Sequence, residues 1–230
     1  MQELIDEFNE RKEEIDCYYK FLRKITSQTY ALKNTRSNTD ICLDSRIQKI
    51  LKANSFLLLY NLIESTVKNS VRFICHEIVK ENIQYNNIVE GLQKQWVRVH
   101  TRQHLQSPKD EKLREGVKYI IDKTLSEFIQ FEGDYEIKYK DNIDTDVMYA
   151  IARDFGFKLD FAKSLKGGYR IGEIRVKRNF LAHGNITFSD CGQNLSMEDL
   201  TAYKNDTYGV LKKFLSVVKT YLNKKKYTNS

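Results

Sequence analysis

Arginine, asparagine and histidine occur together in the segment RVKRNFLAHGN, which covers residues 175–185. On a helical wheel at about 100° per residue, Arg178 falls inside an apolar arc, where a charged group is desolvated unless an anion or a hydrogen-bond partner meets it. His183 falls in the last turn before Gly184, where the negative end of the helix dipole stabilises a protonated imidazole. The segment therefore combines a cation that could hold an anion with a group that could transfer a proton.

A polar stripe lies beside the apolar arc of this helix. Arg175, Asn179 and His183 follow one another at positions i, i+4 and i+8, and Val176 and Phe180 lie beyond them. A helix with apolar groups on both sides of a polar stripe is expected to pack against its own bundle and against something else. A second subunit is the simplest candidate for that second contact. The apolar arc itself is formed by Ile171, Ile174, Leu181 and Ala182.

The elements that would position this segment are helices, because the apolar residues recur mostly at three- and four-residue steps. The pattern over 45–82 is apolar nearly all round in its middle, which predicts a long helix at the centre of a bundle. Tyr135, Ile137 and Tyr139 alternate with polar residues and predict at most a short surface strand. The sequence thus predicts an all-α fold in a single domain over residues 1–230. Helices are expected at 2–26, 45–82 and 86–104, then after Pro108, from about 146, and at 170–184 and 197–226.

Two local signals predict where helices end and begin in the last third of the chain. Gly184 can take the left-handed conformation that commonly follows a helix. Ser196 and Asp199 are spaced like a capping box, in which each side chain accepts a backbone N–H at the start of a helix.

The composition is that of a globular protein with an excess of positive charge. Of the 230 residues, 30% are charged and 41% are hydrophobic, and the formal net charge of +7 favours a polyanionic partner. The longest apolar run, residues 147–152, is far shorter than the ~20 residues of a membrane span. The charged N-terminal segment lacks the apolar core of an export signal, and the four cysteines are scattered singly. We therefore expect a cytoplasmic protein with no membrane contact, and no spacing of these cysteines predicts a metal or cofactor site.

The segment RNFLAHGN (178–185) resembles the signature of HEPN (higher eukaryotes and prokaryotes nucleotide-binding) domains. Ribonucleases of that family carry an arginine, usually a polar residue next, and a histidine after four to six residues, near the end of a late helix in a helical bundle. The order of FLLLYNLIEST (56–66), EIRVKRNFLAHGN (173–185) and a closing amphipathic helix is similar to small bacterial HEPN-like nucleases of toxin–antitoxin and anti-phage loci. The resemblance implies an HEPN-like helical bundle with a long central helix that forms dimers.

The resemblance also implies a metal-independent endoribonuclease. RNA carries its own nucleophile, the 2′-hydroxyl, so a base takes its proton while an acid protonates the leaving 5′-oxygen. His183 would transfer the protons, Arg178 would neutralise the phosphate, and Asn179 would orient the imidazole or hold the phosphate. Arg175 and Glu64 are possible supporting residues. The expected products are a 2′,3′-cyclic phosphate and a 5′-hydroxyl, and DNA should be inert because it lacks the 2′-hydroxyl.

The partners implied by the resemblance are RNA, a second HEPN protomer and a regulator. In the family two protomers bring their motif helices together, so we expect a homodimer or a heterodimer with an HEPN paralogue. The protein is then expected to be a toxin or a defence effector, restrained by an antitoxin or by another partner from a defence system. Some HEPN toxins are silenced by modification of a tyrosine two residues beyond the motif histidine, but that position is Asn185 here.

Two other functions remain open from the sequence. The first is a non-catalytic HEPN-type module that dimerises through the same helix and binds a nucleotide or a protein. The second is a DNA-binding regulator, which is disfavoured because no helix-turn-helix spacing stands out.

Several charged features have simpler structural interpretations. Glu64 lies four residues before Lys68 and could form an ion pair with it. His100 and His104 share a helix face but lack the third ligand of a zinc site, so a solvated pair is expected. The segment WVRVHTRQH (96–104) could contact a phosphate backbone or be merely exposed, and the same holds for the lysine-rich C-terminal helix.

Overall fold

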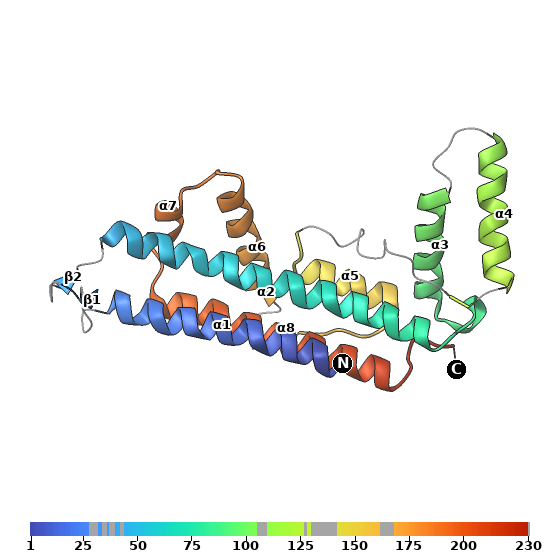
Figure 1. Cartoon of the computed structure of the whole chain (residues 1–230), viewed down its shortest axis with the longest axis horizontal. Coiled ribbons are helices and arrows are strands. Elements are labelled where there is room, and N and C mark those ends of the chain that lie inside the picture. Colours follow the sequence, from blue (N-terminus) through green and yellow to red (C-terminus); the bar gives the residue numbers. More distant parts are fainter. Residues whose placement is uncertain are drawn as a thin grey trace. The chain divides into compact units, whose positions relative to one another are not determined.

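A computed structural model describes residues 1–27, 32–33, 36, 40–41, 44–104, 110–126, 128–129, 142–161 and 168–229. The described residues form eight α-helices, one 3-10 helix and one pair of two-residue strands, so the prediction of an all-α fold is confirmed (Figure 1). In chain order the elements are α1 (Gln2–Thr26), β1 (Leu32–Lys33), β2 (Asp40–Ile41), α2 (Ser45–Lys80), η1 (Tyr85–Asn87), α3 (Glu90–His104), α4 (Asp110–Ser126), α5 (Thr145–Phe155), α6 (Tyr169–Ala182), α7 (Phe188–Gly192) and α8 (Met197–Asn223). The strands β1 and β2 pair antiparallel.

Two helix boundaries differ by three or more residues from the sequence prediction, and one helix was missed. Helix α3 begins at Glu90 rather than 86, because the preceding residues form η1 and Ile88 is extended. Helix α8 ends at Asn223 rather than 226, and Lys225 then adopts a positive φ of 46°. Helix α7 was not predicted. The alternating residues Tyr135, Ile137 and Tyr139, together with Pro108, lie outside the described residues.

The contacts between Cα atoms divide the chain into two compact units. The first unit, residues 2–66 and 161–212, contains the Arg178–His183 segment and is called the motif unit. The other, residue 1 with residues 67–160 and 213–230, is called the α3–α5 unit. Helices α2 and α8 contribute residues to both units. A single domain over 1–230 therefore stays a prediction.

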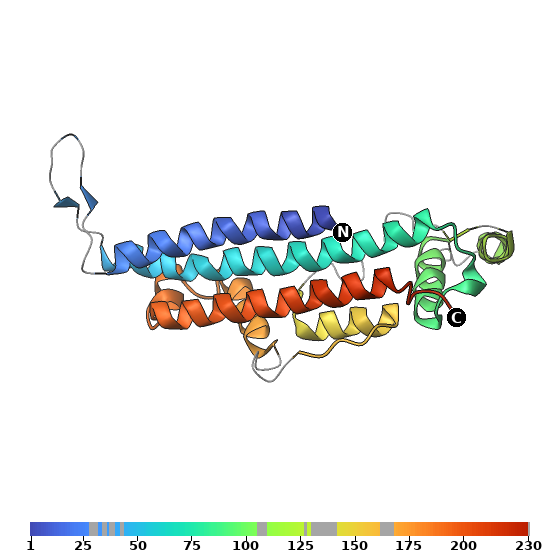
Figure 2. The same cartoon turned by 90° about the horizontal axis from the view of Figure 1, so that it is seen from below.

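The motif unit is built on α1, the first part of α2 and the first part of α8, which run side by side in both views of the ribbon (Figures 1 and 2). Tyr18 of α1 donates a hydrogen bond to the carbonyl of Leu51 in α2. The Nζ of Lys204 in α8 lies 2.6 Å from Asp16 in α1. Burial opposes ionisation of Asp16, but Lys204 and Lys12 outweigh it and lower the pKa of this carboxyl. The buried core of the unit includes Leu4, Phe8, Ile15, Leu22, Phe56, Leu59, Tyr60, Ile63, Ile171, Ile174, Leu200 and Leu211.

The α3–α5 unit contains the last part of α2, helices α3 to α5 and the end of α8. Helix α3 approaches α5 so closely that a Cβ atom on Gly91 would lie 2.4 Å from the carbonyl oxygen of Asp154, which explains why glycine occupies this position. Two residues before Gly91, the backbone N–H of Val89 donates to the carbonyl of Tyr227 (2.9 Å). Its buried core includes Ile74, Ile78, Leu92, Trp96, Met148, Ile151, Phe155, Phe214, Val218 and Tyr221.

Among the described residues, no helix combines the length and apolar character that crossing a membrane requires.

Candidate functional site

Helix α6 carries the predicted site and begins after Gly168, which has a φ of 81°. Ile171, Ile174 and Leu181 are buried, so the predicted apolar arc faces the core of the motif unit. Ala182 is exposed although the wheel places it in the same arc, because it is the last residue of the helix.

The first turn of α6 contacts α8 through an ion pair, a cation–π contact and a hydrogen bond. The guanidinium of Arg170 lies 2.5 Å from the carboxylate of Asp206 and 5.4 Å from the ring centroid of Tyr203. The hydroxyl of Tyr203 donates to Glu173 of α6 at 3.0 Å. The pKa of Tyr203 is raised to about 12, mainly by burial and secondly by this hydrogen bond to a carboxylate. The phenol therefore stays protonated and acts as a neutral hydrogen-bond donor. These contacts fix the rotation of α6 and therefore the direction of its later side chains.

Arg178 lies against α2, where its guanidinium meets an aromatic face and a carboxylate. Its Cζ is 4.5 Å from the ring centroid of Tyr60, an arrangement typical of a cation–π contact. Its Nη2 lies 4.0 Å from Oε2 of Glu64, which is an ion-pair distance but too long for a direct hydrogen bond. Its Nη1 donates to Oδ1 of Asn179 at 3.0 Å. The side chain keeps 33% of its surface exposed, so an incoming anion can still reach it.

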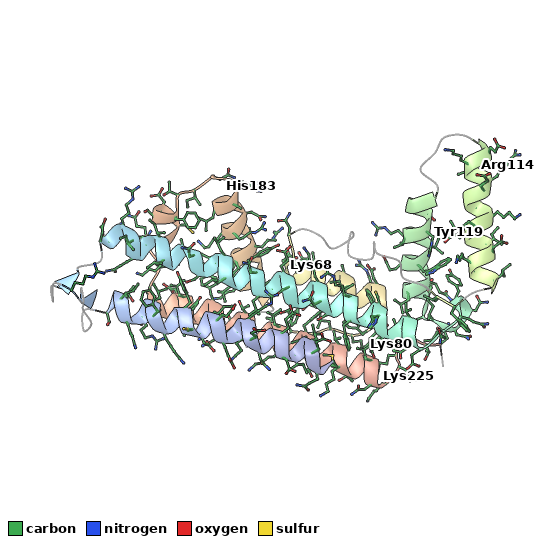
Figure 3. The ribbon with its side chains drawn as sticks, in the orientation of Figure 1. Lys68, Lys80, Arg114, Tyr119, His183 and Lys225 are labelled. Atoms are coloured by element: carbon green, nitrogen blue, oxygen red, sulfur yellow. The ribbon has the colours of Figure 1, made fainter. Side chains whose placement is uncertain are left out.

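His183 occupies the C-cap position of α6, and its residue is exposed. Gly184 follows with a φ of 71°, as predicted, and its N–H donates to the carbonyl of Leu181 (3.3 Å). The N–H of Asn185 donates to the carbonyl of Phe180 (2.8 Å), which completes a Schellman motif. This motif holds the histidine at the free end of the helix (Figure 3).

The structure brings some of the predicted site residues together and leaves the histidine apart. Arg178, Asn179 and Glu64 form one cluster, and Arg175 is half-buried one turn before Asn179. Within the part of the chain that the structure describes, the imidazole of His183 has no hydrogen-bond or ion-pair partner. The described residues of one chain therefore offer an anchored cation and an exposed imidazole, but only this one histidine at the site.

The outward face of α6 is unusually apolar. Tyr169, Val176 and Phe180 expose 66%, 40% and 48% of their surfaces. A Cβ atom added at Gly172 would meet no heavy atom within 4 Å. These four residues are called the apolar strip, and His183 lies beside its end on the same face of the helix.

Sequence reasoning missed Tyr60, whose ring packs under Arg178. Its position four residues before Glu64 on α2 was an available signal, because residues at i and i+4 share a helix face.

The interpretation of His100 and His104 as a solvated pair is wrong for His100. This residue is only 2% exposed, and its ring centroid lies 4.1 Å from that of Trp96. Tyr119 of α4, labelled in Figure 3, also contributes to this burial, because its ring centroid lies 6.1 Å from that of His100. The side chain of His104 lies outside the described residues. Among the residues described, no group of three histidine, cysteine, aspartate or glutamate side chains is placed to hold a metal ion.

Comparison with known proteins identifies one family. The profile of the MAE_28990-like HEPN family matches residues 1–227, nearly the whole chain. No curated protein and no solved structure matches the chain.

Proposed function

Because the chain belongs to the MAE_28990-like HEPN family, we propose that it is an endoribonuclease that uses Arg178, Asn179 and His183. The observation that carries this proposal is that α6 bears both a partly exposed guanidinium, held by Tyr60, and an exposed histidine at its end. A guanidinium whose charge is only partly neutralised by nearby groups attracts the phosphate of the substrate. A solvent-accessible imidazole can exchange protons with the hydroxyl groups of a bound RNA.

The proposed reaction is a transesterification within the RNA strand. An imidazole takes the proton of the 2′-hydroxyl, and the 2′-oxygen forms a bond to phosphorus. The bond from phosphorus to the 5′-oxygen breaks, and an imidazolium gives that oxygen its proton. The guanidinium of Arg178 neutralises the charge that builds on the non-bridging oxygens. The products are a 2′,3′-cyclic phosphate and a 5′-hydroxyl, and no metal or cofactor takes part.

A second copy of the motif helix supplies what one chain lacks. The reaction needs a base and an acid, and each chain brings one His183. The apolar strip on α6 provides a surface that a second copy can bury, and its neighbour His183 would then face the same site from the other side. The protein is thus proposed to act as a homodimer, or as a heterodimer with an HEPN paralogue.

The biological role that fits this activity is that of a cytoplasmic toxin or anti-phage defence effector. A nuclease acting on cellular RNA requires restraint, which we assign to an antitoxin or another protein of the same defence system. Asn185 stands where a modifiable tyrosine would be, so the restraint acts by another route.

The proposal is tested by incubating single-stranded RNA and tRNA with wild-type protein in EDTA and analysing the new ends. Wild type is expected to leave cyclic phosphates, and Arg178→Ala and His183→Ala should each lower the rate by about 10²-fold or more. His76→Ala is the matched control, because His76 is also an exposed histidine but lies on the other unit. Equal cleavage by all four proteins, or none by wild type, would leave the non-catalytic dimerisation module as the better account.

A further inference from the structure

An open cavity of about 470 Å³ lies in the α3–α5 unit, well away in sequence from the Arg178–His183 segment. Tyr85 of η1 and four residues of α3 line it: Lys94, Val97, Arg98 and Thr101. The volume falls within the range of small-ligand sites and suits one nucleotide rather than a folded partner. Three of the lining residues, Val97, Arg98 and Thr101, lie in the segment WVRVHTRQH. From the sequence, this segment could either contact a phosphate backbone or be merely exposed.

The floor of the cavity is apolar and held in place. The ring of Tyr85 packs edge-on against Trp96 with centroids 5.2 Å apart. The side-chain amide of Gln93 donates to the backbone carbonyl of Tyr85 at 3.0 Å, which fixes η1 on α3. Val97 exposes 36% of its surface beside this ring. Burial raises the pKa of Tyr85 above its ordinary value, so the phenol adds no negative charge to the cavity at neutral pH.

The rim of the cavity is cationic. Lys94 and Arg98 are four residues apart on α3 and therefore project from the same face of the helix. Lys94 lies 2.5 Å from Glu90, but both side chains are highly exposed, so this ion pair is weak. Arg98 is exposed and forms no ion pair with any residue that the structure describes. The rim thus keeps a net positive charge next to an aromatic floor.

We propose that this cavity binds one nucleotide of a single-stranded RNA, with the base against Tyr85 and Val97 and the backbone phosphate at Arg98 and Lys94. Aromatic floors with cationic rims bind single strands because every base has a stacking face and every nucleotide has a phosphate. The wide opening allows the strand to continue on both sides of the bound nucleotide. The assignment of the polymer as RNA rests on the proposed function. The binding of a single-stranded nucleic acid at this cavity does not depend on that proposal.

The only tryptophan of the chain makes the test specific. Trp96 is 3% exposed and touches the ring of Tyr85, so a base that stacks in the cavity should change its fluorescence, whereas binding on α6 should not. The probe is a short single-stranded oligonucleotide of 2′-O-methyl RNA, which cannot be cleaved through its 2′-oxygen. Fluorescence anisotropy of the labelled oligonucleotide measures total binding in parallel.

Two pairs of variants separate the cavity from general electrostatic attraction. Arg98→Glu should weaken the saturable Trp96 signal by about ten-fold or more, as expected for loss of a contact in a stacked site. Arg114→Glu is the matched control, since it makes the same charge change on the exposed surface of α4 without lining the cavity. Tyr85→Leu should likewise weaken binding, and Tyr85→Phe should restore it because the ring is kept.

The outcomes are decisive in both directions. Equal losses in Arg98→Glu and Arg114→Glu, or binding without any change in Trp96 fluorescence, would overturn the proposed site. A mononucleotide such as UMP that binds as tightly as the oligonucleotide would overturn the assignment to a strand. An acidic peptide that competes equally well would overturn the assignment to nucleic acid. Because the probe is not cleaved, binding at this cavity can be confirmed even if the protein proves not to be a nuclease. Equally, failure to bind at this cavity would not contradict the proposed nuclease activity of the Arg178–His183 segment.

Discussion

Replacing Gly192 with alanine is expected to destabilise the motif unit strongly. Gly192 is the last residue of α7 and is buried where this helix meets the backbone of α2. A Cβ atom at this position would lie 1.9 Å from the carbonyl oxygen of Lys49 and 2.7 Å from its carbonyl carbon. Both contacts are with backbone, so no side-chain rotation relieves them.

The size of the effect follows from the displacement that alanine demands. The two backbones must separate by more than about 1 Å, and overpacking of this kind costs about 3 kcal/mol. The segment around α7 resists such a shift, because Lys52 of α2 donates a 2.7 Å hydrogen bond to the carbonyl of Leu195. Helix α7 follows the end of α6 after a short connection, so a shift of α7 also disturbs His183.

The assay is urea unfolding followed by far-UV circular dichroism. With a slope of about 2–3 kcal/mol per molar urea, Gly192→Ala should lower the midpoint by about 1 M. Gly172→Ala is the matched control, because a Cβ there meets nothing in the same chain, and alanine should raise stability by about 0.5–1 kcal/mol through helix propensity. Since Gly172 lies in the apolar strip, both variants are measured at two protein concentrations to separate unfolding from dissociation. A midpoint for Gly192→Ala within 0.2 M of wild type, about 0.5 kcal/mol, would refute the close approach of α7 to α2.

Three further outcomes are expected. Phe180→Asp should convert the proposed dimer to monomer in sedimentation velocity and abolish cleavage, and an unchanged sedimentation coefficient would argue against the apolar strip as the interface. Glu64→Gln should lower cleavage in single-turnover assays while changing stability by no more than about 1 kcal/mol, because its ion pair with Arg178 is long and partly exposed; unchanged cleavage would leave Glu64 without a supporting role. Asp16→Asn should cost about 1 kcal/mol at neutral pH in urea unfolding. Because the folded-state pKa of Asp16 is lowered, this difference is present above the ordinary value of 3.8 and is lost as the pH falls below it, and a difference that persists in acid would contradict the ion-pair explanation.

The local features of the site could be predicted from the sequence because they depend on neighbouring residues. The burial of Ile171, Ile174 and Leu181 follows from helical periodicity, and the turn at Gly184 follows from its freedom to adopt a positive φ. The capping box of α8 was predicted in the same way. The backbone N–H of Ser196 donates to the carboxylate of Asp199 at 3.0 Å, and the backbone N–H of Asp199 donates to the hydroxyl of Ser196 at 3.0 Å.

The remaining features depend on how separate helices face one another. The ring of Tyr60 lies under Arg178 only because α2 and α6 meet at a particular rotation, which periodicity does not specify. His100 is polar and follows Val99, so exposure was the natural expectation, yet the packing of Trp96 and Tyr119 buries it. Helix α7 has only five residues, and its formation depends on the Thr187 cap and on the contact at Gly192. Such short elements carry too few residues for a periodic signal.

The two compact units divide the chain in the middle of two helices rather than in a linker. The division falls between Thr66 and Val67 in α2 and between Lys212 and Lys213 in α8. A half-helix that ends without a cap loses both its terminal hydrogen bonds and its packing, so we expect neither unit to fold when it is expressed without the other. Mutations that loosen the core around Ile74 or Phe214 should therefore lower the melting temperature of the whole chain, including the Arg178–His183 segment, in one cooperative transition.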